Sequence, residues 1–412
     1  MSAFGSVFLA ALVLATSVRL WLARRQIGHV RAHRGRVPAD FAREIDLPAH
    51  QKAADYTCAR TRFVMAEVST GAVVALAFTF GGGLQLLHEV SAWWLPQGIA
   101  RGLVLIALVG AATALIDLPF DYYRTFVIES RFGFNKTTPG LFFVDTAKGL
   151  LVGALLLLPL AAVILWFIRE VRDDWWLWAW AVTVLYGVFV HFIAPTVIAP
   201  LFNKFLPMRD AELKERVERL LTRCGFKVKG LMVMDGSRRS AHGNAYFTGF
   251  GSSKRIVFFD TLLAQLGPAE VEAVLAHELG HFRRRHVVKR MAWSSAFSFG
   301  LFWLLSFLVQ QDWFYGGLGV ESPSPAMALV LFMFVVPPFT FLLHPLSALY
   351  SRRHEFEADQ YAVQNASARD LVSALIKLYR DNASTLTPDP LHSAFYDSHP
   401  PAIARIARLK SA

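Results

Sequence analysis

Cysteine is scarce in this sequence, and acidic residues are fewer than basic ones. The 412 residues include two cysteines, Cys58 and Cys224, and no CxxC pair, so we expect neither a disulfide framework nor a cysteine-ligated zinc site. Any metal in this chain would therefore use histidine and carboxylate side chains. We also find no internal repeat and no low-complexity tract.

Polar residues are too few to cover the surface of a soluble protein. Hydrophobic residues make up 54% of the chain, and the mean hydropathy is +0.39. They come in long blocks, which indicates a membrane protein. The net charge of +11 would suggest nucleic acid as a partner of a soluble protein. Here the basic residues collect in loops between apolar blocks, so we expect the lipid bilayer as the partner and no nucleic acid.

Seven apolar stretches approach or exceed the ~20 residues that a helix needs to cross a bilayer. They are Phe4–Leu22, Phe63–Leu87, Ile99–Leu118, Ala147–Ile168, Trp175–Ala199, Met291–Val309 and Ala326–Ala348. The first stretch could be a signal peptide, but Arg24 and Arg25 follow it and no basic residue precedes it, so we interpret it as a retained span. The predicted fold class is mainly α, a polytopic membrane protein.

Basic residues alternate between the two sides of the predicted membrane. The segments after spans one and three are rich in arginine and lysine, whereas those after spans two, four and six carry few or none. The positive-inside rule then places the N-terminus outside and the C-terminus in the cytoplasm.

Two polar regions interrupt the apolar pattern, and both fall on the predicted cytoplasmic side. The region from 200 to 290 begins with a helix, for which Asp210 is a good N-cap and Gly225 a stop signal. Three β-rich runs follow, and then a helix from about Pro268. The β-rich runs are Lys227–Met234, Ala245–Phe250 and Ile256–Phe259. The predicted divisions of the chain are 1–199 (spans one to five), 200–290 (a small α+β catalytic domain), 291–348 (spans six and seven) and 349–412 (a C-terminal catalytic segment).

The helix after Pro268 carries an HExxH motif that runs from His277 to His281. Two histidines at i and i+4 share one helix face, so both rings can reach one zinc ion. Glu278 follows the first histidine and can address a water molecule on that ion. Zinc lowers the pKa of a bound water to about 7, and a carboxylate can then take its proton.

A catalytic zinc needs a third protein ligand and an open position. One class of HExxH proteins has a third histidine six residues after the second, but Val287 occupies that position here. His286 is five residues after His281, which turns it away from the ligand face of a helix. We therefore interpret His286 as part of the cytoplasmic margin of span six.

The better candidates for a third ligand lie on the helix that leaves span seven. Glu355 and Asp359 are at i and i+4, so one carboxylate can bind zinc while the other accepts the free N–H of a ligating histidine. Glu357 faces away from both. Alternatively, these acids pair with Arg352 or Arg353 on a solvated helix.

Further segments resemble the type I CAAX prenyl proteases, a family of membrane zinc metalloendopeptidases. The segments are Glu129–Thr137, Ile198–Phe205, His242–Phe250, Ser351–Asp359 and Ser398–Pro401 with Arg405. They follow the order of the family from about residue 129 to the end of the chain, and seven spans is also the family's number. The combination is much more specific than HExxH alone.

The resemblance implies a fold in which seven long helices form a barrel around a hollow chamber within the membrane. A small α+β HExxH zinc-peptidase domain would lie at the cytoplasmic end of that chamber. The resemblance also implies one Zn²⁺ per chain, with His277, His281 and Glu355 as its ligands.

The same resemblance implies roles for five more residues. Glu278 would be the general base, and Asp359 would orient a ligating histidine. Asn244 would bind the substrate backbone beside an edge strand, and His399 and Arg405 would hold the developing oxyanion or the acidic shell of the site. Without the resemblance, we would interpret Asn244 as a turn residue and His399 as part of a rigid loop before two prolines. Arg405 could then snorkel or cap a helix.

Two further histidines are weaker candidates for function. His242 precedes the strand that would bind substrate and could line the cleft. His344 precedes Pro345 within span seven, where an ionisable residue indicates a functional site. It could equally hydrogen-bond a carbonyl that the proline leaves unpaired.

The predicted function is therefore zinc-dependent hydrolysis of peptide bonds in C-terminal or unfolded membrane-associated segments, prenylated or not. The composition, rich in alanine and arginine, suggests a bacterial protein of the inner membrane. The alternative is a membrane transporter or scaffold with a structural zinc site, for which the Gly81-Gly82-Gly83 sequence and several prolines within spans would be suitable. Glu278 would have no purpose in such a site.

Overall fold

The computed structural model describes residues 2–171, 173–228, 230–248 and 255–410. In this part of the chain, seven helices are long and apolar enough to cross a membrane, which confirms the predicted number. They are Ala3–Ala32, Leu47–Phe78, Ile99–Glu129, Pro139–Glu170, Trp175–Phe202, His286–Leu308 and Pro325–Asn365. The protein is thus a multi-pass membrane protein made mainly of α-helices.

Several of these helices extend beyond the predicted apolar stretches, because polar residues continue them past the membrane. Helix α1 (Ala3–Ala32) runs ten residues past Leu22 into basic sequence. Helix α5 (Pro139–Glu170) begins eight residues before Ala147, where the side chain of Thr138 caps its N-terminus.

The second predicted span, Phe63–Leu87, is wrong at its C-terminal end. Helix α2 (Leu47–Phe78) stops before the three glycines, and a separate helix, α3 (Gly83–Trp94), begins at the third of them. Gly82 has a φ of 74°, a left-handed conformation that glycine adopts without strain. The run of apolar residues is therefore divided between a membrane helix and a short helix at the end of the barrel.

Three of the remaining membrane spans contain short irregular turns, whereas α11 (His286–Leu308) is a continuous α-helix. Helix α4 (Ile99–Tyr123) continues into the π-helix η1 (Arg124–Glu129), and α6 (Trp175–Ile193) continues through η2 (Ala194–Ile198) into α7 (Ala199–Phe202). The last span comprises α13 (Pro325–Thr340), the 3₁₀ turn η5 (Phe341–Leu343) and α14 (His344–Asn365). The change at η5 follows Pro337 and Pro338, whose missing N–H groups remove helical hydrogen bonds.

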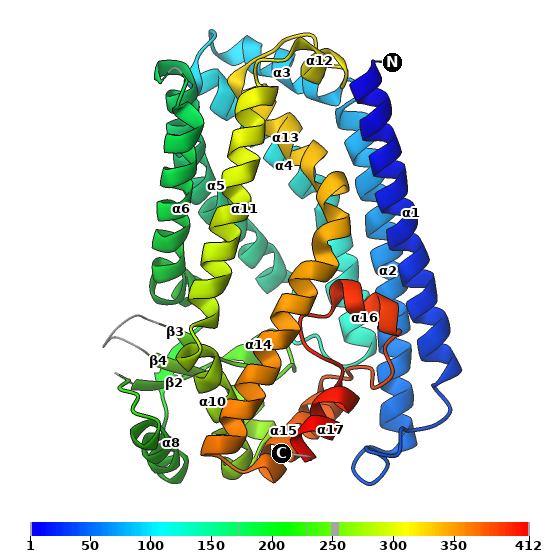
Figure 1. Ribbon diagram of the computed structural model, residues 1–412, viewed down its shortest axis with the longest axis vertical. Coiled ribbons are helices and arrows are strands. Elements are labelled where there is room, and N and C mark those ends of the chain that lie inside the picture. Colours follow the sequence, from blue (N-terminus) through cyan, green and yellow to red (C-terminus); the bar gives the residue numbers. More distant parts are fainter. Residues whose placement is uncertain (1, 172, 229, 249–254, 411–412) are drawn as a thin grey trace.

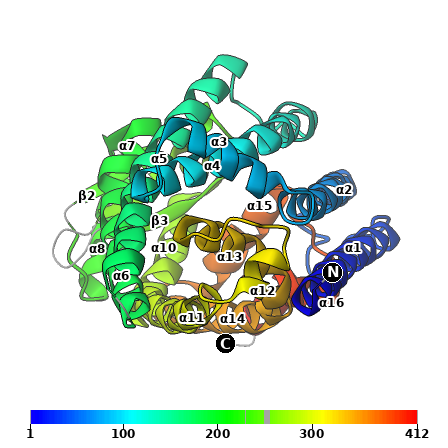
Figure 2. The same ribbon diagram turned by 90° about the horizontal axis from the view of Figure 1, so that it is seen from above.

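The membrane helices form a hollow barrel, which appears as a ring when the molecule is seen from above (Figures 1 and 2). Many of their apolar side chains pack against nothing in the protein: Leu185 is 69% exposed and Leu155 is 64% exposed. One end is closed by a core that joins α3, α13 and α12 (Asp312–Gly316) to the neighbouring spans through residues such as Phe8, Leu105 and Met327. The exposed apolar surface is what a lipid environment requires.

A small α+β domain lies at the opposite end of the barrel (Figure 1). Its sheet has the strand order β1-β2-β4-β3, in which β2 and β4 are parallel and the other pairs are antiparallel. The strands are β1 (Phe205–Pro207), β2 (Gly230–Met234), β3 (Ala245–Thr248) and β4 (Arg255–Phe259). The predicted β-rich runs contain β2 and β3 and nearly all of β4, although Gly249 and Phe250 lie outside the described residues. The sequence analysis missed β1, which has three residues and ends in proline.

Short helices pack around this sheet and on the ends of α14 and α1. They are α8 (Ala211–Arg223), η3 (Gly236–Arg238), α9 (Asp260–Gln265), α10 (Pro268–Arg283), α15 (Ala368–Asp381), α16 (Pro390–Tyr396) and α17 (Ala402–Lys410). Asp210 caps α8 and accepts the N–H of Leu213 at 3.0 Å, as predicted. One apolar core, which includes Leu220, Phe258 and Leu279, joins α8, the sheet and α10. The helix that carries HExxH is therefore held on a rigid base.

Candidate metal centre

Helix α10 presents both histidines of the HExxH motif to the same point. The helix begins with Pro268, and Glu270 accepts the N–H of Gly267 at 2.8 Å, which satisfies a free donor at the helix start. The Nε2 atoms of His277 and His281 lie 3.1 Å apart. The i, i+4 spacing thus brings both ring nitrogens together, as the sequence predicts.

Glu355 on α14 completes the group. Its carboxylate oxygens lie 3.5 Å from Nε2 of His277 and 3.3 Å from Nε2 of His281. Candidate ligand atoms of these three residues all lie within 4.8 Å of one another. Gly280 allows this approach, because a Cβ atom at that position would meet Cα of Ala358 on α14 at 2.9 Å. A larger residue would separate the two helices that carry the site.

The chemistry of this group fits a metal cation. Two imidazoles and one carboxylate are the donor set of a common class of catalytic zinc site, which keeps further positions open. Oε2 of Glu355 is buried and accepts no well-directed hydrogen bond, although Nδ1 of His399 lies only 2.6 Å away. A buried carboxylate whose two oxygens each face one imidazole nitrogen of the motif is an arrangement that a cation would satisfy.

Asp359 and Arg405 surround the opposite side of His277. Oδ1 of Asp359 lies 2.8 Å from Nδ1 of His277, so this carboxylate can accept the ring N–H and leave Nε2 for a metal. Arg405 is buried and donates from Nε to Asp359 at 2.9 Å. The alternative pairing with Arg352 or Arg353 is not found: Arg352 donates to backbone carbonyls and Arg353 pairs with Glu357.

The environment of His277 stabilises its protonated form in the metal-free protein. Burial favours the neutral ring, but the neighbouring carboxylates of Asp359 and Glu355 outweigh burial and raise the pKa of His277 to about 9. A proton on this ring competes with a metal for the same nitrogen.

Zinc binding should therefore weaken as the pH falls below about 9. His277 must lose its proton to bind, so the apparent affinity should decrease by about tenfold for each pH unit below its pKa. Competition titration with a chelator at pH 7, 8 and 9 measures this dependence, after correction for the chelator's own protonation. An affinity that does not change over this range would contradict the assigned protonation of His277.

Glu278 is the acidic residue of the HExxH motif. Its side chain is half-buried, and within the described residues no hydrogen bond or ion pair holds its carboxylate. It follows His277 on α10 and is free to interact with a water molecule or a substrate. This is the position that a general base requires.

His399 and Asn244 lie at the edges of the site region. The His399 ring is 61% exposed and approaches Glu355 from the loop after α16. Asn244 is exposed and directly precedes β3, which is an edge strand among the described strands. Its Oδ1 accepts the N–H of Ala245 at 2.8 Å, as expected for a turn residue. The neighbouring His242 contacts Asn382 at 3.0 Å.

The sequence analysis missed two residues that adjoin the metal group. Nδ1 of His286 lies 3.0 Å from Nδ1 of His281, and Nε2 of His286 lies 3.1 Å from Oε2 of Glu357. If Nε2 of His281 binds a metal, its Nδ1–H donates to His286, and His286 then donates its own proton to Glu357. With Nε2 of His281 on a metal, this is the one placement of protons that gives His281, His286 and Glu357 a hydrogen-bond partner each. Both histidines of HExxH thus reach a carboxylate, one directly and one through His286.

Replacing His286 with glutamine should lower the zinc affinity by about 10- to 100-fold, the usual cost of losing a group that orients a metal ligand. His286 is 1% exposed and stacks on His354, with ring centroids 4.0 Å apart, so glutamine is chosen to keep polar contacts. Zinc affinity is measured by chelator competition, with thermal unfolding of the metal-free protein as the check on folding. His33→Gln, on the exposed end of α1, is the control. An unchanged zinc affinity would show that His286 does not orient His281.

Comparisons with known proteins agree with this geometry. Residues 26–204 match the family described as CAAX prenyl protease N-terminal, five membrane helices, and residues 207–412 match peptidase family M48. The chain is 32% identical to the mouse CAAX prenyl protease 1 homolog over 98% of this chain and 96% of the mouse protein. It is 34% identical to the Arabidopsis thaliana homolog over 90% of this chain and 89% of that protein. The crystal structure of S. mikatae Ste24p matches with a TM-score of 0.93 and 30% identity, over 99% of each chain.

Fold, site and comparisons together define an integral membrane metalloendopeptidase. The chain belongs to the CAAX prenyl protease 1 family, within peptidase family M48.

Proposed function

We propose that this protein is a zinc-dependent endopeptidase and that His277, His281 and Glu355 hold its single zinc ion. The observation that supports this most strongly is the convergence of these three side chains from two helices. Glu278 lies next to His277 in the sequence, and within the described residues no hydrogen bond or ion pair holds its carboxylate. Zinc bound there would polarise a peptide carbonyl and acidify a water molecule. Family M48 membership favours this function over a transporter or scaffold with a structural zinc.

Glu278 would carry the proton in this reaction. Its carboxylate would accept a proton from the attacking water and then donate it to the leaving amine nitrogen. Arg405 and Asp359 would keep the His277 ring in one tautomer, because Asp359 accepts its Nδ1–H and Arg405 holds Asp359 in place. His399 is exposed and close to Glu355, so it could also donate to the oxygen of the carbonyl under attack.

The peptide would lie along β3. An edge strand offers backbone N–H and C=O groups to an extended chain, and Asn244 directly precedes this strand. A hollow barrel would admit an extended or C-terminal segment and exclude folded domains. The substrates would therefore be C-terminal or unfolded segments of membrane-associated proteins. The names of the relatives suggest prenylated C-termini as one substrate class.

The distribution of basic residues supports an orientation with the metal centre at the cytoplasmic side and the N-terminus outside. The composition supports a bacterial inner membrane. Residues 200–290 and 349–412 would then form the catalytic part, on a frame of membrane helices from residues 1–199 and 291–348.

The test is cleavage of quenched fluorescent peptides by the purified protein in detergent, with prenylated and unprenylated versions of one sequence. We expect cleavage that stops on removal of zinc with a chelator and returns when one equivalent of zinc is added. Zinc binding without cleavage of either peptide would instead favour a structural zinc site. Equal cleavage of both peptides would exclude a requirement for prenylation.

A further inference from the structure

A cavity at the closed end of the barrel has no role in the metal centre. Its volume is about 380 Å³, and its wall comes from α3, α4, α5 and α13 and from the residues just before α4 and α13. It lies where the spans Ile99–Glu129 and Pro325–Asn365 begin and where the span Pro139–Glu170 ends. The α+β domain with the metal group lies at the opposite end of the barrel (Figure 1). The cavity is therefore placed where three apolar spans reach their ends.

The wall of this cavity contains two arginines and no acidic residue. Arg101 is in the first turn of α4, and Arg169 is in the last turn of α5. The apolar part of the wall includes Ile99, Leu105 and Leu165. Cationic groups beside apolar walls suit a ligand that has an anionic group and an apolar part, and ligand pockets usually measure about 300 Å³ or more.

Arg101 has no negative partner in this wall. Its half-buried guanidinium meets neutral groups, since Nη2 lies 3.0 Å from Nε2 of His88 and Nε donates to Oγ of Ser91 at 3.4 Å. Within the described residues Arg101 forms no ion pair, and its Nη1 donates no hydrogen bond. Glu89, the acid of α3, instead accepts a hydrogen bond from Gln85 at 3.1 Å. Arginine keeps its charge in proteins, so the free N–H groups of Arg101 are available to an anion.

His88 beside Arg101 offers a further donor. It is 9% exposed, and burial together with the charge of Arg101 lowers the pKa of His88. The neutral ring accepts a hydrogen bond from Arg101 at Nε2 and carries its proton on Nδ1. In the part of the chain that the structure describes, this Nδ1–H has no acceptor, and His88 lines the cavity. Buried donors usually have a partner, so this one also favours a ligand with acceptor oxygens.

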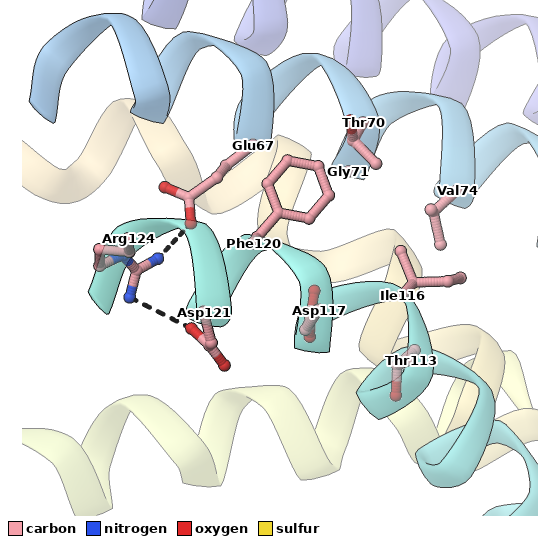
Figure 3. A pocket seen from close by; sticks show the side chains of 10 residues that line it. All are labelled: Glu67, Thr70, Gly71, Val74, Thr113, Ile116, Asp117, Phe120, Asp121 and Arg124. Atoms are coloured by element: carbon pink, nitrogen blue, oxygen red, sulfur yellow. Dashed lines mark hydrogen bonds and ion pairs between the residues drawn. The ribbon is translucent and has the colours of Figure 1, made fainter. Parts of the chain in front are cut away.

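A second charged cavity of the barrel has the opposite composition. It measures about 330 Å³ and lies between α2 and α4, and its wall contains Glu67, Asp117 and Asp121 but only one basic residue, Arg124 (Figure 3). Arg124 pairs with Glu67 and lies 3.4 Å from Asp121. That arginine is neutralised within the protein, and its cavity keeps a negative charge. An anion is therefore expected at Arg101 and not at Arg124.

The surroundings of the cavity favour a lipid as the source of the anion. Trp93 and Trp94 at the end of α3 are 79% and 70% exposed. Exposed tryptophans are enriched at the level of the lipid head groups. Helix α4 also begins after Gly98, which has no side chain to cap it, so its first N–H groups are free to face an anion. Phosphate is the anionic group that a phospholipid bilayer presents at this level.

We propose that this cavity binds the phosphate group of an anionic phospholipid, with Arg101 as its main contact and Arg169 as a second contact. A planar guanidinium can donate two parallel hydrogen bonds to phosphate oxygens. The positive wall favours a lipid with a net negative charge over a zwitterionic one. The bound lipid would join α3, α4, α5 and α13 and so stabilise the closed end of the barrel. The inference goes beyond the proposed peptidase function and does not depend on it.

The experiment measures lipid binding to the purified full-length protein in detergent by native mass spectrometry. The probes are phosphatidylglycerol and phosphatidylcholine with the same acyl chains. We expect the wild type to bind one phosphatidylglycerol about 10-fold more tightly than phosphatidylcholine, and Arg101→Gln to lower the affinity for phosphatidylglycerol by about 10- to 100-fold through loss of a charge-assisted contact. An about 100-fold excess of inorganic phosphate should not displace the lipid, because phosphate leaves the apolar wall unfilled.

Two further variants separate lipid binding from folding. The Arg169 side chain is 62% exposed and its ion pair with Glu170 is also exposed, so Arg169→Gln should fold normally. It should lower the affinity for phosphatidylglycerol by about two- to fivefold, as expected for an exposed charge contact. Arg24→Gln, an exposed arginine on α1, is the control and should bind the lipid like the wild type. Thermal unfolding of the lipid-free protein checks each variant.

Several outcomes would overturn the proposal. These are equal affinity for the two lipids, unchanged affinity for phosphatidylglycerol in a folded Arg101→Gln protein, or the same loss of affinity in Arg24→Gln. If Arg101→Gln does not fold, an unchanged affinity in Arg169→Gln overturns the proposal instead. Displacement of the lipid by inorganic phosphate at a similar concentration would assign the site to free phosphate. Lipid binding is measured without peptide cleavage, so this inference and the proposed function can fail separately.

Discussion

Replacing Glu278 with glutamine should reduce peptide cleavage by about 10²- to 10⁴-fold, the usual contribution of a general base. Zinc should stay bound, because the expected ligands His277, His281 and Glu355 are unchanged and converge without help from Glu278. The measurement is kcat for a quenched fluorescent peptide, together with zinc content by elemental analysis. The loss should appear in kcat and not in KM, since the glutamine side chain has nearly the same shape and cannot accept the proton.

The control for this variant is Glu272→Gln on the same helix. Glu272 pairs with Arg216 and Arg223 at the surface, both at 3.0 Å. Exposed pairs of this kind contribute about 0–1 kcal/mol each, so activity should be unchanged. Full activity in Glu278→Gln with normal zinc content would show that another group accepts the proton.

Replacing Glu355 with glutamine should remove zinc as well as activity. The carboxylate of Glu355 is 5% exposed and faces both histidines of the motif, so its charge is the main partner for a cation in the group. The loss of zinc affinity should exceed the 10- to 100-fold expected for Asp359→Asn, because Asp359 orients a ligand and does not itself face the metal position. Affinities come from chelator competition on wild type and both variants.

Glu321→Gln, an exposed acid between α12 and α13, is the control for Glu355. Arg405 keeps its pairing with Asp359 in Glu355→Gln, so the folded state should survive, and thermal unfolding of the metal-free protein checks this. A Glu355→Gln protein that binds zinc as tightly as the wild type would show that the third ligand lies elsewhere.

The metal group itself could be predicted from the sequence because it depends mostly on local spacing. His277 and His281 are one helical turn apart, and so are Glu355 and Asp359, and a turn fixes which side chains share a face. Their meeting across α10 and α14 required the family resemblance. The packing that allows it, the close approach at Gly280, has no signature in spacing alone.

His286 was dismissed for a reason that holds only in a continuous helix. Helix α10 ends at Arg283, and Arg285 adopts a φ of 55°, a left-handed conformation that is uncommon outside glycine. This break begins α11 at His286 in a new direction and returns its ring to His281. Glu357 was set aside because it faces away from Glu355 and Asp359 on its own helix. Its partner is His286 on another helix, which spacing along one helix does not reveal.

The membrane helices were predicted in number but less well in extent. Hydropathy locates the apolar part of a helix, and polar continuations such as the end of α1 give no apolar signal. The second span is divided at Gly82, where glycine adopts a left-handed backbone conformation. Hydropathy averaged over a window of residues does not detect such a break.

The central claim is that His277, His281 and Glu355 bind one zinc ion in a site with an open position. The most direct test is an anomalous difference map from crystals of the purified protein, recorded on both sides of the zinc absorption edge. We expect one strong peak per chain, about 2.0–2.2 Å from the three side chains, which disappears below the edge. A peak at another place, or none in a protein that cleaves peptides, would contradict the account.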